Sequence, residues 1–134
     1  MIRVALMLAL ASCGSKTADR PAAVSDEMVA VMDRDVGVVR KVAAALDVAK
    51  GDCKQAAQVV RDNTAAIATA ARESRSYREV AKDNDAVKAW INATYRTKEN
   101  LAAEATLQRV ANQCATDPHY QAAMAQQQAA ASGR

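Results

Sequence analysis

The sequence has no phenylalanine, and its 134 residues include only four glycines, two prolines and one histidine. Glycine and proline are the residues that most often interrupt helices and form tight turns, so their scarcity argues against a fold with many turns. Alanine, the residue with the highest helix propensity, is frequent along the whole chain instead. This composition predicts an all-α fold.

The side chains of common catalytic and metal sites are also scarce. The single histidine, His119, has no carboxylate or cysteine at metal-ligand spacing, and we expect it to face solvent. The chain contains no C-x-x-C-H haem motif, no paired Glu-x-x-His motif of di-iron bundles and no Gly-rich phosphate loop. We therefore predict that the protein is not an enzyme and uses no metal or cofactor. Its net charge of +3 is too small to indicate nucleic-acid binding.

Residues 1–13 have the pattern of a bacterial export signal. Arg3 supplies a positive charge, residues 4–10 form a short apolar segment, and two small residues precede Cys13. The apolar segment is much shorter than the roughly 20 residues of a transmembrane helix. The stretch Leu10-Ala11-Ser12-Cys13 resembles the lipobox of bacterial lipoproteins. The resemblance implies removal of residues 1–12 and acylation of Cys13, with a palmitate-like chain as one of the acyl groups.

This resemblance also predicts a location. Residues 13–20 would form a lipidated tether that spans at most about 25 Å beyond Cys13, so the domain would stay near the bilayer. Gly14 follows the acylated position, where enterobacterial lipoproteins retained in the inner membrane carry aspartate. We therefore expect a lipid-anchored protein of the cell envelope, in the outer membrane rather than the inner one. Ordinary signal cleavage after Ala9-Leu10-Ala11 is the alternative, and it would give a soluble periplasmic or secreted protein.

The chain has three cysteines, Cys13, Cys53 and Cys114. Ordinary secretion would leave an odd thiol in an oxidising compartment, whereas lipidation of Cys13 leaves an even pair. We therefore predict a disulfide between Cys53 and Cys114. Two reduced cysteines in a cytosolic bundle are the alternative, which the export signal disfavours.

Capping and turn residues predict where the helices begin and end. Ser25 is a candidate N-cap of the first helix, Gly51 ends that helix, and Asp52 caps the second. Asp117-Pro118 begins a short C-terminal helix. The predicted fold is an antiparallel three-helix bundle over about 21–50, 52–82 and 85–115, followed by a short helix over about 118–130. The predicted domain organisation is a signal peptide at 1–12, a tether at 13–20 and a bundle domain at 21–134.

The cysteines determine where we place the second turn. A turn near Arg75 would set Cys53 about 25 Å from Cys114. A disulfide tolerates Cα separations of only about 4.4–6.8 Å. A turn at Asp83-Asn84-Asp85, with Asp85 as N-cap, sets the two cysteines directly opposite each other in a long hairpin. We therefore predict that the second helix ends there.

A candidate partner surface lies near this turn. Arg72, Arg75 and Arg78 fall on the outer side of the second helix, and Tyr77 and Trp90 could form an aromatic cluster. The alternatives are a solvated, salt-bridged face for the arginines and ordinary core packing for the aromatic residues. If Trp90 is exposed, this tip is the best candidate for partner binding, because aromatic residues and arginine are enriched at hot spots.

Asp35 interrupts the apolar face of the first helix. That face otherwise carries Met28, Met32, Val39, Val42, Leu46 and Ala49. We interpret Asp35 as a paired or half-exposed carboxylate, with a functional acid as the alternative.

Three functions are compatible with these features. We predict a non-enzymatic envelope lipoprotein, anchored in the lipid bilayer through Cys13, that acts as a structural or adaptor module by contact with an envelope protein. The first alternative is a helical bundle that holds a lipid-like molecule. An elongated apolar cavity would favour it, and a close-packed core would exclude it. The second alternative is a small periplasmic inhibitor or immunity-type protein, which would have a charged patch rimmed by aromatic side chains.

Overall fold

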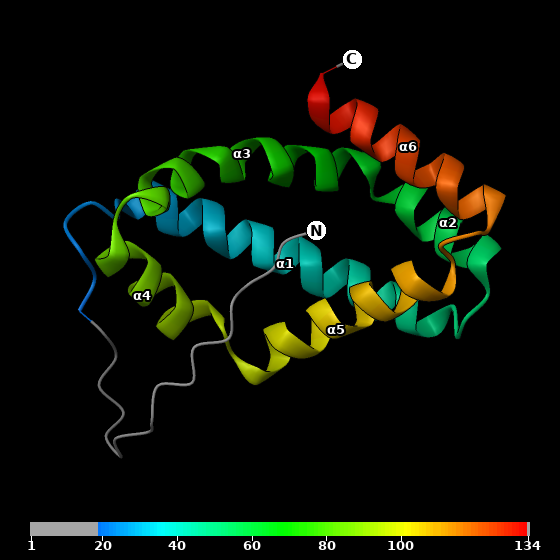
Figure 1. Cartoon of the computed structure of the whole chain (residues 1–134), viewed down its shortest axis with the longest axis horizontal. Coiled ribbons are helices and arrows are strands. Elements are labelled where there is room, and N and C mark those ends of the chain that lie inside the picture. The colour runs from blue at the N-terminus through cyan, green and yellow to red at the C-terminus, as the bar shows by residue number, and fades with distance from the viewer. Residues whose placement is uncertain (1–18, 134) are drawn as a thin grey trace.

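A computed structural model describes residues 19–133 of the chain. Within this range it has six α-helices and no strand, so the prediction of an all-α fold is confirmed (Figure 1). The helices are α1 (Asp26–Val48), α2 (Cys53–Asp62), α3 (Thr64–Lys82), α4 (Asp85–Tyr95), α5 (Lys98–Gln113) and α6 (Pro118–Ser132). The predicted signal peptide, Cys13 and most of the predicted tether lie outside the described residues. No helix within 19–133 is long and apolar enough to span a membrane.

Side-chain caps set the start of several helices. Ser25, Asp52 and Asp117 each accept a hydrogen bond from a backbone N–H two or three residues further on, as N-caps do. These three predicted caps are confirmed. At the second turn the cap is Asn84, whose side chain accepts from a backbone N–H in the first turn of α4. Asp85 is therefore the first helical residue and not the cap that the sequence predicted.

The helix predicted over 52–82 is two helices, because the helical conformation is interrupted at Asn63. The Asn63 side chain donates to the carbonyl of Val59 (2.8 Å), and the Thr64 hydroxyl donates to the carbonyl of Val60 (2.9 Å). Side chains that bond to carbonyls four residues back compete with the helical hydrogen bonds and bend the helix. The prediction of one continuous helix is corrected here to α2 and α3.

The helix predicted over 85–115 is also two helices, and its break lies just before Thr97. Thr97 is extended and caps α5 by accepting from the N–H of Asn100 (3.2 Å). The Asn100 amide donates in turn to the carbonyl of Tyr95 (2.7 Å), and its oxygen accepts from Arg40 of α1 (2.6 Å). These bonds hold the corner between α4 and α5 against α1.

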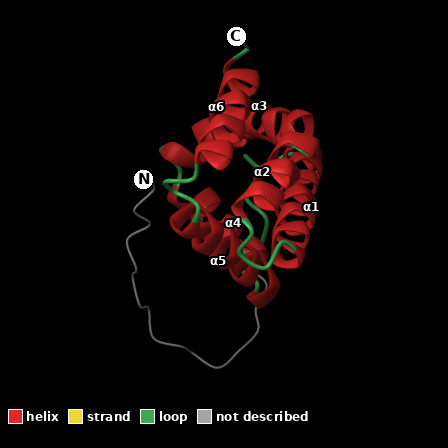
Figure 2. Ribbon diagram, turned by 90° about the vertical axis from the view of Figure 1, so that its right-hand side faces the viewer, coloured by secondary structure: helices red, strands yellow, loops and turns green. Residues whose placement is uncertain are grey.

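α1 is the central helix of the fold (Figure 1). It packs against α3 on one side and α5 on the other, while α6 packs across α2 and α3. Seen from the end, α3 and α6 lie on one side of the molecule and α5 lies on the other (Figure 2). The predicted hairpin, with the second and third helices packed along their whole length, is therefore not what the structure has. The most extensive packing of α3 is with α6 and α1, and that of α5 is with α1.

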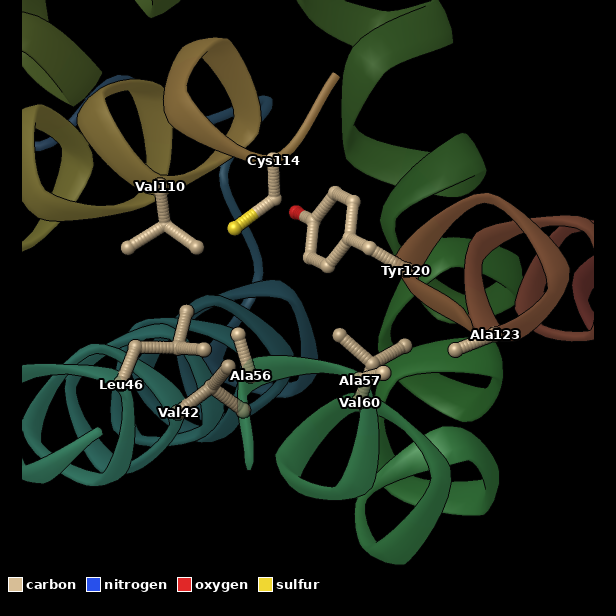
Figure 3. Close-up of a cluster of buried hydrophobic side chains, with 9 residues drawn as sticks. All are labelled: Val42, Leu46, Ala56, Ala57, Val60, Val110, Cys114, Tyr120 and Ala123. Atoms are coloured by element: carbon tan, nitrogen blue, oxygen red, sulfur yellow. The ribbon is translucent and has the colours of Figure 1, made fainter. Parts of the chain in front are cut away.

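Two groups of buried side chains form the hydrophobic core. The disulfide-end core comprises Val42, Leu46, Ala56, Ala57, Val60, Val110, Cys114, Tyr120 and Ala123 (Figure 3). The tryptophan-end core comprises Val24, Met32, Val87 and Trp90, with partly buried Met28, Val29, Tyr77, Ala81, Ile91 and Tyr95 packed around them. The two cores use opposite ends of α1, so the middle of that helix lies between them.

The predicted disulfide is present in the disulfide-end core. Cys53 and Cys114 are joined with an S–S distance of 2.07 Å and a Cα–Cα distance of 5.5 Å. The bond ties the start of α2 to the residue that ends α5, across a sequence separation of 61. A loop of this length corresponds to about 4 kcal/mol in the chain-entropy account of disulfide stabilisation.

Candidate ligand-binding pocket

A pocket of about 510 Å³ lies between the two cores, and it is partly open to solvent. Its volume is in the range of sites that hold small molecules, which is about 300–1,000 Å³. Most of its lining is apolar. The apolar lining residues are Val38, Val39, Val42, Leu46, Val60, Ile67, Ala70, Ala71, Leu107, Ala111, Tyr120 and Met124.

Five helices line the pocket. α2 contributes Val60 alone, and helical periodicity explains the lining residues of the other four. On α5 these residues follow an i, i+3, i+4, i+7 pattern, at Glu104, Leu107, Gln108 and Ala111. The same spacing recurs on α3 from Ile67 onward, and on α6 and α1. Residues three or four apart share one face of a helix, so each helix presents a single stripe to the pocket.

The pocket stays unfilled because of which side chains occupy these stripes. The two aromatic side chains of the cores do not occupy the middle of the pocket, since Trp90 lies in the tryptophan-end core and Tyr120 lines the end of the pocket that adjoins the disulfide-end core. The stripes between them carry alanine at three positions, Ala70, Ala71 and Ala111. Alanine side chains are short, so these three positions fill little of the space between the helices, and the sequence has no phenylalanine to fill it.

One end of the pocket is polar and centred on Asp35. This carboxylate is only 8 % exposed, and its Oδ2 accepts a hydrogen bond from the Tyr77 hydroxyl (2.8 Å). Its Oδ1 is buried and has no hydrogen-bond partner among the described residues. Ser74 and Arg78 line the same end. The prediction of a paired carboxylate is thus correct for one oxygen of Asp35, but the side chain is buried and not half-exposed.

Burial governs the protonation of this polar end. It raises the pKa of the Asp35 carboxyl above its usual value, and the hydrogen bond from Tyr77 opposes that rise. Among the charged neighbours, Glu73 raises the pKa of Asp35 further, while Arg34 and Arg78 lower it. Burial and then the nearby carboxylate raise the pKa of Tyr77 to about 12. The Tyr77 hydroxyl therefore keeps its proton at neutral pH and acts as a hydrogen-bond donor.

The opposite end of the pocket adjoins the disulfide-end core. Tyr120 of α6 is buried there, and its ring lies beside Cys114 (Figure 3). Burial raises the pKa of Tyr120. Asp35 and Leu46 both line the pocket and lie eleven residues apart on α1. At about 1.5 Å per residue this is about 16 Å, so the lined space is elongated along α1.

The residues of the predicted partner surface do not lie on one exposed face. Arg72 and Arg75 are exposed, and they donate to the carbonyls of Ala130 (2.9 Å) and Ala131 (3.3 Å) near the end of α6. These bonds add donors to carbonyls of the last turn of α6, where the carbonyl of Ala130 also accepts from the N–H of Gly133 (3.4 Å).

The remaining three residues of that predicted surface lie elsewhere. Arg78 and Tyr77 line the pocket, and Tyr77 is half-buried. Trp90 is 8 % exposed and packs edge-to-face with Tyr95, with ring centroids 6.1 Å apart. The sequence analysis favoured partner binding at this tip if Trp90 is exposed, and Trp90 is buried.

A second pocket, of about 380 Å³, lies where α1 faces the corner between α4 and α5. Its polar groups bond to one another. The Tyr95 hydroxyl donates to Asp33 (2.8 Å), and Arg40 donates to Asn100 (2.6 Å). His119 is exposed near the start of α6. Among residues 19–133 there is no group of three or more side chains that could hold a metal ion.

A comparison of the chain with protein-family models, with curated proteins and with solved structures returns no significant match. The sequence analysis named an elongated apolar cavity only as the feature that would favour its lipid-holding alternative, and it did not predict which residues line the 510 Å³ pocket. Among those residues it singled out Asp35, an acid on an otherwise apolar face.

Proposed function

We propose that this protein binds a lipid-like molecule in the pocket lined by α1, α2, α3, α5 and α6. The observation that supports this proposal is an elongated, mostly apolar space of about 510 Å³ with one polar end. A ligand that buries apolar groups there gains about 0.8 kcal/mol per methylene removed from water. The polar end would fix the direction in which an amphipathic molecule lies.

The lipid anchor is part of the proposal. Acylation of Cys13, as the lipobox resemblance implies, would hold the pocket close to a bilayer, where lipid-like molecules are abundant. Intact mass of the mature protein tests this part. We expect loss of residues 1–12 and a mass increase from acylation, which a Cys13→Ser variant would lack. A mature protein that begins at Ser12 without acylation would contradict it.

Filling the pocket tests the binding function. We would measure the affinity of the apolar fluorescent dye N-phenyl-1-naphthylamine for the full mature protein. Ala70→Leu with Ala111→Leu adds two large side chains to the pocket lining, and it should weaken dye binding at least about tenfold, which is about 1.4 kcal/mol. The matched control is Ala66→Leu with Ala105→Leu, which places leucines at exposed positions of the same two helices.

The outcomes of this experiment are distinct. Dye binding that is lost in the filled variant and kept in the control supports the pocket as the site. A wild-type protein that does not bind the dye, or a filled variant that binds as well as the control, overturns the proposal. Circular dichroism and urea unfolding show whether the filled variant is folded, since overpacking can cost about 1–3 kcal/mol.

An adaptor role through an envelope protein stays a prediction. The large apolar side chains that are exposed among the described residues are Val48, Val80 and Leu101, and they lie on three different helices. Single exposed apolar residues are common on monomeric proteins and do not indicate a partner. A pull-down from gently solubilised envelopes tests this role, as it does the inhibitor alternative, and a stoichiometric partner would favour either one.

A further inference from the structure

The polar end of the pocket contains an acceptor that the fold leaves unsatisfied. Asp35 lines the pocket and is more than nine-tenths buried. Its Oδ2 accepts from Tyr77, whereas its Oδ1 is buried without a hydrogen-bond partner among residues 19–133. Buried polar atoms in folded proteins are almost always bonded, so an exception requires an explanation.

A second tyrosine–aspartate pair shows that the pairing alone is not the unusual feature. Tyr95 donates to Asp33 at the same distance, 2.8 Å, as Tyr77 does to Asp35. Asp33 is exposed, so its second oxygen is accessible to water. Asp35 differs because its carboxylate is enclosed next to an apolar space. Asp35 lines the pocket and its Oδ1 is buried, so a donor bound at this end would meet the unsatisfied oxygen once the carboxylate turns toward the pocket.

The charges around Asp35 favour a neutral donor. Arg34 pairs with Glu73 (3.1 Å), so these two neighbours largely offset each other. Arg78 lines the pocket and is the remaining cation near Asp35. Asp35 and Arg78 together carry no net charge. A carboxylate or an ammonium head would be attracted by one of these two residues and repelled by the other, and it would also lose its hydration on entering the mostly apolar pocket. A hydroxyl can donate to Asp35 without either penalty.

We infer that the ligand is an uncharged, single-chain lipid whose head carries a hydroxyl group, and that this hydroxyl donates to Oδ1 of Asp35 while the chain lies along α1 toward Leu46. Long-chain alcohols and monoacylglycerols have this chemistry. The inference rests on the proposed function, because it names the class of molecule that the same pocket would take.

Matched probes of one chain length test the head group. Decan-1-ol, decyl methyl ether, decanoate and decylamine would each compete with the dye on the wild-type protein. The alcohol and the ether have nearly the same size, but only the alcohol can donate a hydrogen bond. A hydrogen bond to a charged group contributes enough that we expect the alcohol to bind about tenfold or more tightly than the ether. We expect decanoate and decylamine to bind more weakly than the alcohol.

A double variant tests the acceptor. Asp35→Leu with Tyr77→Phe removes both members of the pair, so neither is left without the other. The preference for alcohol over ether should fall to about onefold, and this ratio is the readout because both substitutions lie in the pocket lining and can change the affinity of the two probes together. The matched control is Asp33→Leu with Tyr95→Phe, which removes the exposed pair and should keep the full preference.

The results separate failure of this inference from failure of the proposed function. If neither alcohol nor ether displaces the dye, the pocket does not bind lipid-like chains and both proposals fall. If both displace it equally from the wild type, or if the double variant keeps the preference, only the hydroxyl assignment falls. Tighter binding of decanoate would replace it with a carboxylate held by Arg78, and tighter binding of decylamine would replace it with a cation held by Asp35.

Discussion

The disulfide-end core and the tryptophan-end core lie at opposite ends of α1 and use different side chains. The disulfide-end core consists mainly of alanine and valine, with Leu46 and Tyr120 as its largest members. The tryptophan-end core has only four fully buried residues, but these include Met32 and Trp90, and two tyrosines pack around them. Apolar stabilisation increases with the area removed from water, so each residue contributes more at the tryptophan end.

The difference shows two ways to stabilise a helical domain that has few large side chains. At one end the chain closes a long loop through Cys53 and Cys114, which limits the entropy of the unfolded state. At the other end a few aromatic side chains supply the buried area. The pocket extends from the disulfide-end core, with which it shares Val42, Leu46, Val60 and Tyr120, toward the other end of α1. The two ends should therefore respond to different perturbations.

The largest effect should come from removing the tryptophan. Trp90→Ala should lower the free energy of unfolding by about 3–5 kcal/mol, because it leaves a cavity in a core with few other members. Trp90 is the only tryptophan, so urea unfolding should be followed by circular dichroism. Trp90→Phe is the control and should restore most of the loss. If Trp90→Ala costs less than about 1 kcal/mol, the tryptophan end does not depend on buried area as we argue.

Removing the disulfide should have the next largest effect. Cys53→Ala with Cys114→Ala should lower the free energy of unfolding by about 2–4 kcal/mol. Amide hydrogen exchange should show the loss of protection mainly in α2 and α6, which pack at the disulfide end. The oxidised wild type in the same buffer is the reference. An equal loss of protection in α4 would contradict the distinction between the two ends.

A smaller effect, which depends on pH, should come from the polar end of the pocket. The folded-state pKa of Asp35 is raised above 3.8, so this group stabilises the fold below about pH 4, and that contribution is lost as the pH rises through the folded-state pKa. The charged groups that act on Asp35 are Glu73, Arg34 and Arg78, and Tyr77 donates to it.

Asp35→Asn should remove this pH dependence. We expect the free energy of unfolding of Asp35→Asn to increase relative to that of the wild type as the pH rises from about 4 to about 7. Urea unfolding at each pH measures this difference. The control is Asp33→Asn, because Asp33 also accepts a hydrogen bond from a tyrosine but is exposed. A constant difference between Asp35→Asn and wild type over this range would show that the carboxyl titrates alike in the folded and unfolded states.

The smallest effect should come from the arginines that reach the end of α6. Arg72→Gln with Arg75→Gln removes two donors to the carbonyls of Ala130 and Ala131, and it should cost about 1 kcal/mol or less. Fraying of the last turn of α6, seen as faster amide exchange there, is the expected sign. Arg61→Gln serves as the control, since Arg61 bonds only to Gln58 of its own helix among the described residues.

The sequence predicted the parts of the fold that depend on short-range chemistry. Ser25, Asp52 and Asp117 are strong N-caps, and the structure has all three. Gly51 has a φ of +86°, which favours glycine at this tight turn. The disulfide followed from cysteine number and spacing. The caps and the glycine turn could be predicted because each depends on a few neighbouring residues, and the disulfide because it is a single covalent pairing.

The two breaks and the pocket were not predicted, because they depend on tertiary structure. Asn63 and Thr97 are both compatible with a helix interior. The helices are interrupted at these residues because side-chain hydrogen bonds, such as that from Asn100 to the carbonyl of Tyr95, satisfy the backbone groups that the interruption frees. The breaks turn two long helices into four, and α3 and α5 then flank α1 without filling the space between them. Helical periodicity cannot distinguish an alanine that packs tightly from one that lines a cavity.

The disulfide also determines what a protease could remove from the native protein. A single cut between residues 54 and 113 leaves two fragments that remain joined through Cys53 and Cys114. A cut in the segment between α5 and α6, at 115–117, severs α6 from the rest, because α6 lies outside the covalent ring. Since α6 forms one wall of the pocket, a single hydrolysed peptide bond in this short segment could dismantle the site while the ring itself stays closed. A cut at 49–52 would have the same result by severing α1, which lines the pocket and also lies outside the ring.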